Sequence, residues 1–372
     1  MVAKIKVLHI IKSLGRGGAE MLLPETLKQH DQEQFEFHYI YFLPWKNQMV
    51  EAIESAGGKV TCFKANNNIQ LLLQFRKIIA YCKQNNIQII HAHLPWAGFV
   101  SRIVYKIKKK PTLYTEHNLQ ERYHFITKVL NKLSFNFQSQ GIGVSDDVTN
   151  SITKKIAPKT AAVTILNGVN TDSFIRNDLD AKKSIRNQYA IPEDAFLVGT
   201  VAVFRFQKRL DLWLEIIAKA IKVNPKIYGI IVGAGPLNSE LLAKHKELNL
   251  EGKVIFTGLQ TQVKPYYEAM DAFMMSSSFE GLPIALLEAM SMECAILTTN
   301  AGGIKEVLKK NEEGIMVDVD QWSQLSEFLV DLSQNSNKLT NFQTKSRERV
   351  ISDFSIETMV SKLEKMYLHY SK

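Results

Sequence analysis

The stretch FEGLPIALLEAM places two carboxylates, Glu280 and Glu288, on either side of an apolar run. Pro283 suits the first turn of a helix, so Glu280 is expected in the loop before that helix and Glu288 inside it. The backbone amides of Gly281 and Leu282 lie between the two acids. Carboxylates accept hydrogen bonds from hydroxyl groups, whereas amides donate them to anions or hydroxyls. The stretch therefore suits one extended, hydroxyl-rich ligand.

A cluster of cations stands in FRFQKRLD, residues 204–211, directly after a predicted strand. Arg205, Lys208 and Arg209 are the charged members of this cluster. Each of them alone could be an ordinary surface charge. Together, at a strand end, they suit a diphosphate, because cations neutralise the negative charge that grows on a leaving phosphate group.

A glycine-rich loop, SLGRGGAE at residues 13–20, follows the first predicted strand. Gly15, Gly17 and Gly18 let the backbone approach a ligand, and the amides that open the next helix favour an anion. A tight structural turn is the alternative reading. The spacing G-x-G-G differs from the G-x-G-x-x-G of dinucleotide-binding proteins, which argues against a nicotinamide oxidoreductase.

Histidines end two predicted strands of the first half, in HAHL (91–94) and TEHN (115–118). His117 is predicted to present its imidazole to a sugar hydroxyl or a substrate carbonyl, and His93 is a weaker candidate for the same kind of role. A buried structural role is the alternative for both. His91 and His93 share one strand face, as two zinc ligands would, but no third ligand is obvious, so we expect no bound metal.

Short apolar runs alternate with longer amphipathic stretches such as 70–85, which is predicted to be helical. This alternation predicts mostly parallel sheets covered by helices on both faces. The predicted strands are 5–11, 35–43, 59–63, 87–94, 111–117, 141–145 and 161–167 in the first half, and 195–204, 226–233, 253–258, 272–277, 294–299 and 314–318 in the second.

The chain has 372 residues, too many for one ordinary core, so two α/β domains are expected. Three widely spaced cysteines fit neither a disulfide framework nor a metal site and favour a reducing, cytoplasmic compartment. No secretory signal or membrane span is recognised in the sequence. The 45% apolar and 22% charged residues are typical of globular proteins.

The net charge is +9. Much of it lies in residues 102–132, which contain eight lysines and arginines but only two glutamates. Three interpretations stay open for this segment: a solvated basic face, a surface for anionic lipid headgroups, or a nucleic-acid-binding surface. The sequence has no helix-turn-helix, zinc-finger or ribonucleoprotein pattern, so we expect no nucleic-acid partner.

The spacing E-x7-E in 279–290, followed by glycines 302–303 and Glu306, resembles the donor-site signature of retaining glycosyltransferases of family 4. These enzymes have the GT-B architecture, two Rossmann-like domains with parallel sheets that face each other across a cleft. The resemblance covers nearly the whole chain, with motifs in the family's order: GRGGAE (15–20), HAHL, TEHN, VSD (144–146), NGVN (167–170), QKR (207–209) and VGAGPL (232–237).

The resemblance implies a role for each matching residue. Glu280 would bind hydroxyls of the donor sugar and His117 would touch that sugar near the reacting centre, which makes these two the catalytic candidates. Glu288 would hold the ribose and Lys208 the diphosphate. The family usually has an arginine five residues before this lysine, where this chain has Val203, so Arg205 is expected to substitute. The remaining donor-side candidates are Gly17, Gly18, Gly258, Gly281, Leu282 and Leu287, and His93 and Glu20 are assigned to the acceptor side.

The strand–helix pattern, interrupted by a polar segment, predicts the limits 1–170 for the first domain, a linker at 171–190, a second domain at 191–352, and a C-terminal helix at 353–372. In the two-domain enzyme that the resemblance implies, the second domain would bind the donor and this helix would pack back on the first domain. The expected activity is transfer of a hexose-type sugar from a nucleotide diphosphate sugar, a UDP- or GDP-sugar, with retention of configuration. Neither a cofactor nor a metal is expected. The acceptor would be a saccharide or lipid-linked saccharide in polysaccharide or lipopolysaccharide assembly.

The cytoplasm, with peripheral binding at the inner face of the membrane, is the expected location. A nucleotide-sugar epimerase of the same fold is the alternative enzyme, and a nucleic-acid-binding protein is the alternative of a different class.

Overall fold

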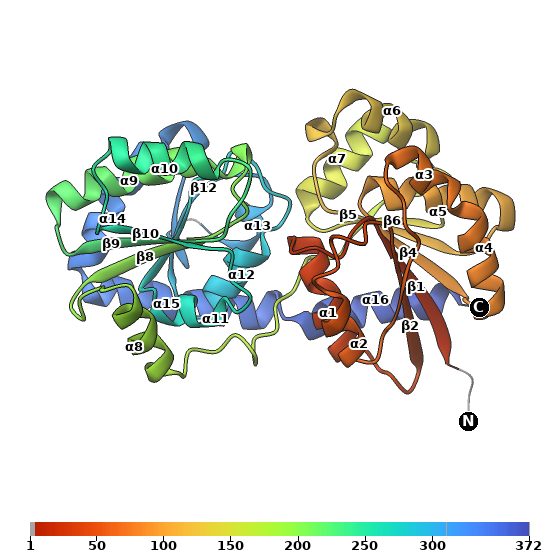
Figure 1. Cartoon of the computed structure of the whole chain (residues 1–372), viewed down its shortest axis with the longest axis horizontal. Coiled ribbons are helices and arrows are strands. Elements are labelled where there is room, and N and C mark those ends of the chain that lie inside the picture. The colour runs from red at the N-terminus through yellow and green to blue at the C-terminus, as the bar shows by residue number, and fades with distance from the viewer. Residues whose placement is uncertain (1–3, 310, 372) are drawn as a thin grey trace. The chain divides into compact units, whose positions relative to one another are not determined.

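The computed structural model describes residues 4–309 and 311–371. The chain divides into two compact units. Met1–Gly168 and Ile356–Lys372 form the first unit, and Val169–Ser355 forms the second. Figure 1 shows the two units, each with helices on both sides of its own sheet.

The first unit contains a parallel sheet in which seven described strands pair in the order β3-β2-β1-β4-β5-β6-β7. Every strand predicted for this half of the chain forms. Their bounds are β1 Ile5–Ile11, β2 Phe35–Tyr41, β3 Lys59–Cys62, β4 Ile89–His93, β5 Thr112–Glu116, β6 Gln140–Gly143 and β7 Val163–Thr164.

The helices of the first unit cover this sheet. The stretch 70–85 was predicted as one helix, and this prediction is wrong: the helix is interrupted at Gln74, which ends α3 and starts α4. Asn67 caps α3 by accepting the amide of Gln70, which sets a separate start for this short helix. The bounds are α1 Gly18–Gln29, α2 Val50–Ser55, α3 Asn68–Leu73, α4 Phe75–Gln84, α5 Pro95–Lys108, η1 Gln120–Arg122, α6 Phe125–Ser134, α7 Asp146–Ile156 and α16 Ile356–Tyr370.

The last helix, α16, belongs to the core of the first unit. Its buried Leu363 and Tyr367 pack with Leu23 and Leu27 of α1 and with Val7 of the sheet. In Figure 1 this blue helix lies beside the red and orange elements from the start of the chain. Side chains alternate between the faces of a strand, so the face that carries Val7 meets α1 and α16.

The second unit contains a parallel sheet in which six described strands pair in the order β10-β9-β8-β11-β12-β13. The predicted strands form here too: β8 Phe196–Val201, β9 Ile227–Val232, β10 Val254–Gly258, β11 Ala272–Met275, β12 Ala295–Thr299 and β13 Gly314–Val317. The helices are α8 Leu179–Gln188, η2 Phe206–Lys208, α9 Leu210–Val223, α10 Asn238–Glu247, α11 Lys264–Ala269, α12 Ile284–Ser291, α13 Ile304–Val307, η3 Val319–Gln324, α14 Leu325–Gln334 and α15 Ser336–Asp353.

The polar segment between the two halves is packed on the second unit. Its helix α8 carries Arg186, which is buried and binds Asp271 at 2.8 Å. The same guanidinium donates to the carbonyl oxygens of Ala195 and Ala269. These bonds attach the segment to the sheet of the second unit.

Both sheets have the strand order of a Rossmann fold, which reverses direction between two neighbouring central strands. The reversal lies between β1 and β4 in the first unit and between β8 and β11 in the second. Ligands of open α/β sheets bind outside the carboxyl ends of the strands at this point.

Two further features concern the chain as a whole. The cysteines Cys62, Cys82 and Cys294 are free thiols. Across residues 4–309 and 311–371, every helix is too short or too polar to cross a bilayer.

Candidate active site

Lys208 and Glu280 meet at the carboxyl edge of the second sheet. Lys208 ends η2, which follows β8, and Glu280 lies in the loop after β11, so the two come from the strands at which the order reverses. The Lys208 Nζ atom donates to Glu280 Oε1 at 2.6 Å, and the Ser277 hydroxyl donates to the same oxygen at 2.6 Å. Glu280 is buried, so these donors compensate the loss of water around its charge.

A serine hydroxyl and a glycine hold the loops of this pair in place. The Ser276 hydroxyl bonds to the carbonyl oxygens of Lys208 and Arg209 at 3.1 and 2.8 Å. Gly302, after β12, has φ +63°, and a Cβ atom there would lie 2.2 Å from the Glu280 carbonyl oxygen. A glycine is therefore required at position 302 for the loop to keep this close approach.

Glu288 lies inside α12, as predicted, and is buried. The Tyr267 hydroxyl donates to Glu288 Oε2 at 2.9 Å. Burial, followed by the neighbouring Glu288 charge, raises the pKa of Tyr267 well above its ordinary value, so Tyr267 remains a neutral donor. Leu287 beside it is completely buried in the core of the second unit.

The other donor-side candidates lie at loops and helix starts. Arg205 is exposed and precedes η2. Gly281 and Leu282 are buried between Glu280 and the start of α12, and Gly258 ends β10 with φ +70° and open space where a Cβ would be.

In the first unit, Gly17 caps α1, Gly18 is its first residue, and Glu20 in the first turn accepts from the Ser13 hydroxyl at 3.1 Å.

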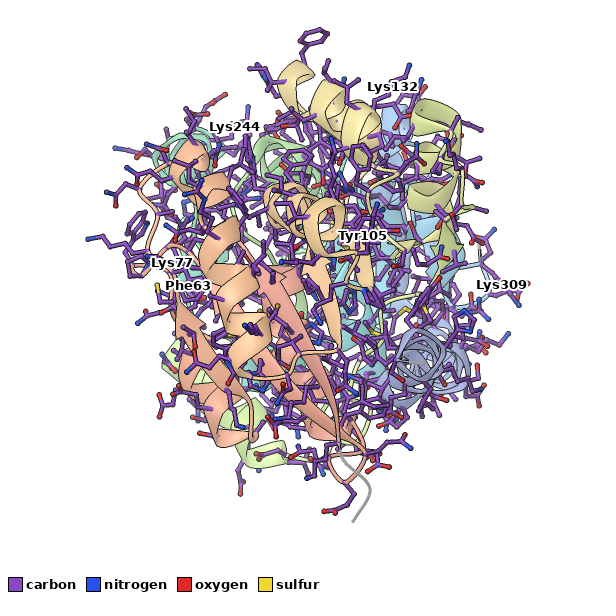
Figure 2. The ribbon with its side chains drawn as sticks, turned by 90° about the vertical axis from the view of Figure 1, so that its right-hand side faces the viewer. Phe63, Lys77, Tyr105, Lys132, Lys244 and Lys309 are labelled. Atoms are coloured by element: carbon purple, nitrogen blue, oxygen red, sulfur yellow. The ribbon has the colours of Figure 1, made fainter. Side chains whose placement is uncertain are left out.

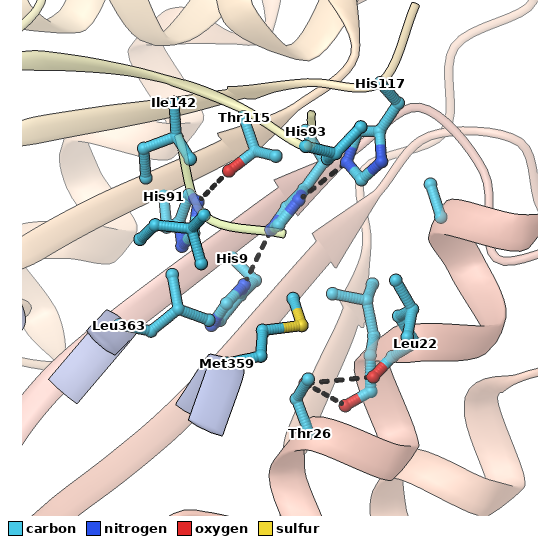
Figure 3. A pocket seen from close by; sticks show the side chains of 14 residues that line it. His9, Leu22, Thr26, His91, His93, Thr115, His117, Ile142, Met359 and Leu363 are labelled. Carbon is cyan, nitrogen blue, oxygen red and sulfur yellow. Dashed lines mark hydrogen bonds between the residues drawn. The ribbon is translucent and has the colours of Figure 1, made fainter. Parts of the chain in front are cut away.

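Three histidines form a row in the first unit, at the edge where the strand order reverses (Figure 3). His9 Nδ1 lies 2.9 Å from His93 Nε2, and His93 Nδ1 lies 3.5 Å from His117 Nε2. The sequence candidates His93 and His117 are thus brought together. His9, from β1, is a member of the row that the sequence analysis missed.

His91 is held separately, by Tyr367 and Thr115. His91 Nδ1 lies 2.7 Å from the Tyr367 hydroxyl, and His91 Nε2 lies 2.7 Å from Thr115 Oγ1. Figure 3 shows these rings around a small cavity that Leu22, Met359 and Leu363 also line. The cavity is small. Its water-accessible volume is about 20 Å³, which is enough for about one water molecule.

Burial lowers the pKa of every histidine around this cavity. The pKa is about 3 for His91 and about 4 for His117, and it lies well below the ordinary value for His9 and His93. The neighbouring histidines lower the pKa of His9, His91 and His93 further. The imidazoles are therefore neutral near pH 7 and can both donate and accept hydrogen bonds.

One ring nitrogen of each of His9, His91 and His93 lies within 4.8 Å of the others. The sequence showed only two possible metal ligands here, His91 and His93, and the structure adds a third, His9 of β1. Neutral imidazoles are ligands for ions such as Zn²⁺. Each of the three, however, already bonds a neighbouring ring, Tyr367 or Thr115. The absence of a metal requirement stays a prediction.

Glu116 anchors the loop that carries His117. Its carboxyl group is completely buried and accepts from the amides of His117 and Asn118 at 3.0 and 3.3 Å. Tyr114 and Gln120 donate to the other oxygen of this carboxyl group, each at 2.7 Å. Burial raises the pKa of Glu116, and the hydrogen bonds oppose that rise.

Three residues of these sites were missed in the sequence: Ser277, Tyr267 and His9. Ser277 had a local signal, because three consecutive serines precede FEGLP. Tyr267 lies 21 residues before its partner Glu288, and His9 lies 84 residues before His93. Spacing along the chain does not reveal such pairs.

Two sugar-transfer family models match successive parts of the chain. Residues 16–173 match "Glycosyltransferase Family 4" and residues 181–349 match "Glycosyl transferases group 1". With two Rossmann-like units and a Lys–Glu pair at a strand-order reversal, the molecule is a glycosyltransferase of the GT-B class. The chain belongs to glycosyltransferase family 4. The predicted family and fold class are confirmed.

Relatives and solved structures agree with this assignment. An Escherichia coli protein named "UDP-Gal:alpha-D-GlcNAc-diphosphoundecaprenol alpha-1,3-galactosyltransferase" is 21% identical over 98% of this chain and 97% of its own length. The Bacillus anthracis "N-acetyl-alpha-D-glucosaminyl L-malate synthase" is 26% identical over 60% of this chain, and the match spans 58% of that protein. The crystal structure of Anabaena HepE with UDP and glucose superposes with a TM-score of 0.88 at 18% identity, covering 98% of this chain and 100% of that one.

Proposed function

We propose that this glycosyltransferase moves a hexose-type sugar from a nucleotide diphosphate sugar to an acceptor hydroxyl with retention of the anomeric configuration. The observation that carries the proposal is the Lys208–Glu280 pair at 2.6 Å, next to the strand-order reversal of the second sheet. An ammonium group has three donors, so Lys208 can hold Glu280 and a phosphate oxygen together. The HepE structures that contain UDP and UDP-glucose support a nucleotide-sugar donor.

Each donor-side residue has a defined part in this proposal. Lys208, joined by Arg205, stabilises the charge on the leaving diphosphate, which removes the need for a metal or another cofactor. Glu280 accepts hydrogen bonds from the sugar hydroxyls, and Glu288 accepts them from the ribose. The amides of Gly281 and Leu282, and the backbone at Gly17, Gly18 and Gly258, complete the donor contacts.

The proposed reaction is a front-face displacement. The bond between the anomeric carbon and the diphosphate oxygen breaks, and the acceptor hydroxyl oxygen bonds to that carbon from the same side. A diphosphate oxygen takes the hydroxyl proton, so the products are a glycoside and a nucleoside diphosphate. His117, which is neutral near pH 7 because burial lowers its pKa to about 4, hydrogen-bonds a sugar hydroxyl near the reacting carbon.

The proposed acceptor is a saccharide linked to a lipid, in the assembly of a surface polysaccharide or lipopolysaccharide. The names of two relatives, from Escherichia coli and Campylobacter jejuni, specify diphospho-undecaprenol acceptors. A Staphylococcus aureus relative, 25% identical over 98% of this chain, is named as a capsular polysaccharide glycosyltransferase. The enzyme would then work at the inner face of the membrane, with His93 and Glu20 on the acceptor side.

The test is a transfer assay with UDP- and GDP-sugars, lipid-linked and free saccharide acceptors, and NMR of the product. The expected product has the anomeric configuration of the donor. Lys208→Ala is expected to lower kcat by about 100-fold or more, because it removes a donor to the leaving group. Lys222→Ala, at an exposed lysine of α9, is the matched control.

Two outcomes would contradict the proposal. An inverted product would exclude the front-face route, and conversion of the nucleotide sugar to its epimer without an acceptor would identify an epimerase.

A further inference from the structure

Helix α6 of the first unit turns two polar residues, Asn131 and Ser134, inward. Asn131 is completely buried and accepts from Arg102 at 2.7 Å, and its amide donates to Gln120 at 2.9 Å. Ser134 accepts from the same guanidinium group at 3.0 Å. Arg102 is itself 1% exposed and stacks over Tyr114. The helix is thus held to the unit by polar contacts along its inner side.

The outer side of α6 carries an apolar stripe. Phe125, Val129 and Leu133 follow one another at the i, i+4, i+8 spacing of a helical stripe, and Ile126 lies next to them. Their exposed fractions are 73% for Phe125, 38% for Val129, 72% for Leu133 and 56% for Ile126. An ordinary surface helix shows the reverse pattern, with its apolar stripe against the core. Clustered exposed apolar side chains of this kind mark an interaction surface.

Positive charges border this stripe. Lys128 and Lys132 lie one helical turn apart on the same outer side, and both are exposed. On the neighbouring helix α5, Lys106 lies over the ring of the partly exposed Phe137, 5.1 Å from its centre. Figure 2 shows Lys132 and Tyr105, from α6 and α5, on the face of the molecule turned to the viewer.

Negative charge is scarce in the same region. Between residues 117 and 137 the sequence contains one acid, Glu121. Its carboxyl group accepts from Ser151 and lies 3.9 Å from Lys155. A second copy of the chain would place an equally positive surface against this one, which like-charge repulsion disfavours. An apolar stripe with lysines along its border instead matches a bilayer surface that carries anionic headgroups.

We propose that α6 is the element that docks this enzyme on an anionic lipid surface. Phe125, Val129 and Leu133 enter the boundary between headgroups and acyl chains, while Lys128 and Lys132 contact lipid phosphates. The proposal deepens the proposed function, on which it rests for the lipid-linked acceptor, by naming the surface that brings the enzyme to it.

The experiment is vesicle flotation of the full chain with phosphatidylglycerol-containing vesicles and with phosphatidylcholine vesicles. The wild-type protein should float with the anionic vesicles. The double variant Phe125→Ser/Leu133→Ser should lose at least about tenfold in binding, because it removes inserted apolar surface. The variant Lys128→Ser/Lys132→Ser should lose about tenfold at low salt and little at high salt.

The matched control is Leu179→Ser/Val223→Ser, which changes two apolar residues of the second unit that are 71% and 67% exposed. It should float like the wild type. Thermal shifts with nucleotides, measured on the same samples, report the donor site separately. If the wild-type protein binds nucleotide but does not float with vesicles, the docking surface alone is refuted. If it floats but does not bind nucleotide, the proposed function is refuted.

Two results would overturn the docking proposal. One is flotation that the Phe125→Ser/Leu133→Ser variant leaves unchanged. The other is a dimer, or a complex with an acidic protein, that forms without vesicles in the wild type and dissociates in this variant. The stripe would then be a protein interface.

Discussion

Two buried carboxylates of the second unit each accept a hydrogen bond from a hydroxyl group, Glu280 from its own loop and Glu288 from the earlier helix α11. Ser277 donates to Glu280, which also binds Lys208, and Tyr267 donates to Glu288. Burial of a charge is costly unless donors replace the lost water. These donors therefore keep the two carboxylates in place at the edge where a nucleotide sugar is proposed to bind.

The four histidines around the cavity of the first unit predict a loss of stability in mild acid. His9, His91, His93 and His117 have folded-state pKa values below the ordinary value of about 6.5, mainly because of burial. Below about pH 6.5 the unfolded chain binds protons that the folded chain does not, so the free energy of unfolding falls as the pH falls. Each histidine contributes at most about 1.4 kcal/mol per pH unit.

Urea unfolding between about pH 7 and pH 5 measures this dependence. His91→Gln, which keeps a polar side chain near Tyr367 and Thr115, should reduce the slope by up to one histidine's share. His369→Gln, at an exposed residue of α16, should leave the slope unchanged. An unchanged slope in His91→Gln would show that the imidazole is already protonated in the folded state.

Most residues of the candidate site could be predicted from residue types and their order along the chain. Glu280, Lys208 and Glu288 were predicted from sequence: Glu280 lies in the expected loop, Glu288 in the expected helix, and Lys208 after the expected strand, at the end of a short helix that was not expected. Their partners were not predicted: Tyr267 lies 21 residues before Glu288, a contact that folding creates, whereas Ser277 lies only three residues before Glu280 and its local signal was overlooked. His117 was predicted by its place after a strand, whereas His9 lies within β1 and reads as part of an apolar strand.

At the scale of elements, the residues of the candidate site follow the carboxyl ends of strands. Lys208 follows β8, Glu280 follows β11, and Gly302 follows β12. All strands were predicted, since their short apolar runs are bounded by turns and helices. The interruption at Gln74 was not, because the apolar pattern continues across it. The outward-facing stripe of α6 was also missed, since the direction of a helix face depends on its packing.

Gly302 gives a test of one such loop. Gly302→Ala forces alanine into a left-handed conformation, which costs about 1–2 kcal/mol of stability. It also places a Cβ atom against the Glu280 carbonyl oxygen. Gly252→Ala, at φ +73° with open space around it, carries the conformational cost alone. We expect Gly302→Ala to lose more stability in thermal unfolding and to weaken nucleotide binding. Equal effects of the two variants would mean that the loop yields without displacing Glu280.

At the scale of the whole molecule, the chain leaves the first unit after Gly168 and returns to it at Ile356. The returning helix α16 supplies Tyr367, whose hydroxyl binds His91, and Glu364, which binds His30 at 2.9 Å. The last segment of the chain thus completes the core behind the histidines. A C-terminal helix was predicted from its apolar spacing, but these polar partners could not be.

We propose that the second unit binds a nucleotide diphosphate without a metal, through Glu288 and Lys208. The most direct measurement is the thermal shift with UDP, GDP, ADP and CDP in the presence of a chelator. Wild-type protein should be stabilised by one of these nucleotides, because a ligand of the native state raises stability.

Glu288→Gln should weaken that shift, because it removes the negative charge and replaces one of the two acceptor oxygens proposed for the ribose with an amide donor. Glu327→Gln, at an exposed position of α14, should leave it unchanged. A shift that requires a divalent metal, or one of the same size in Glu288→Gln and Glu327→Gln, would contradict the account.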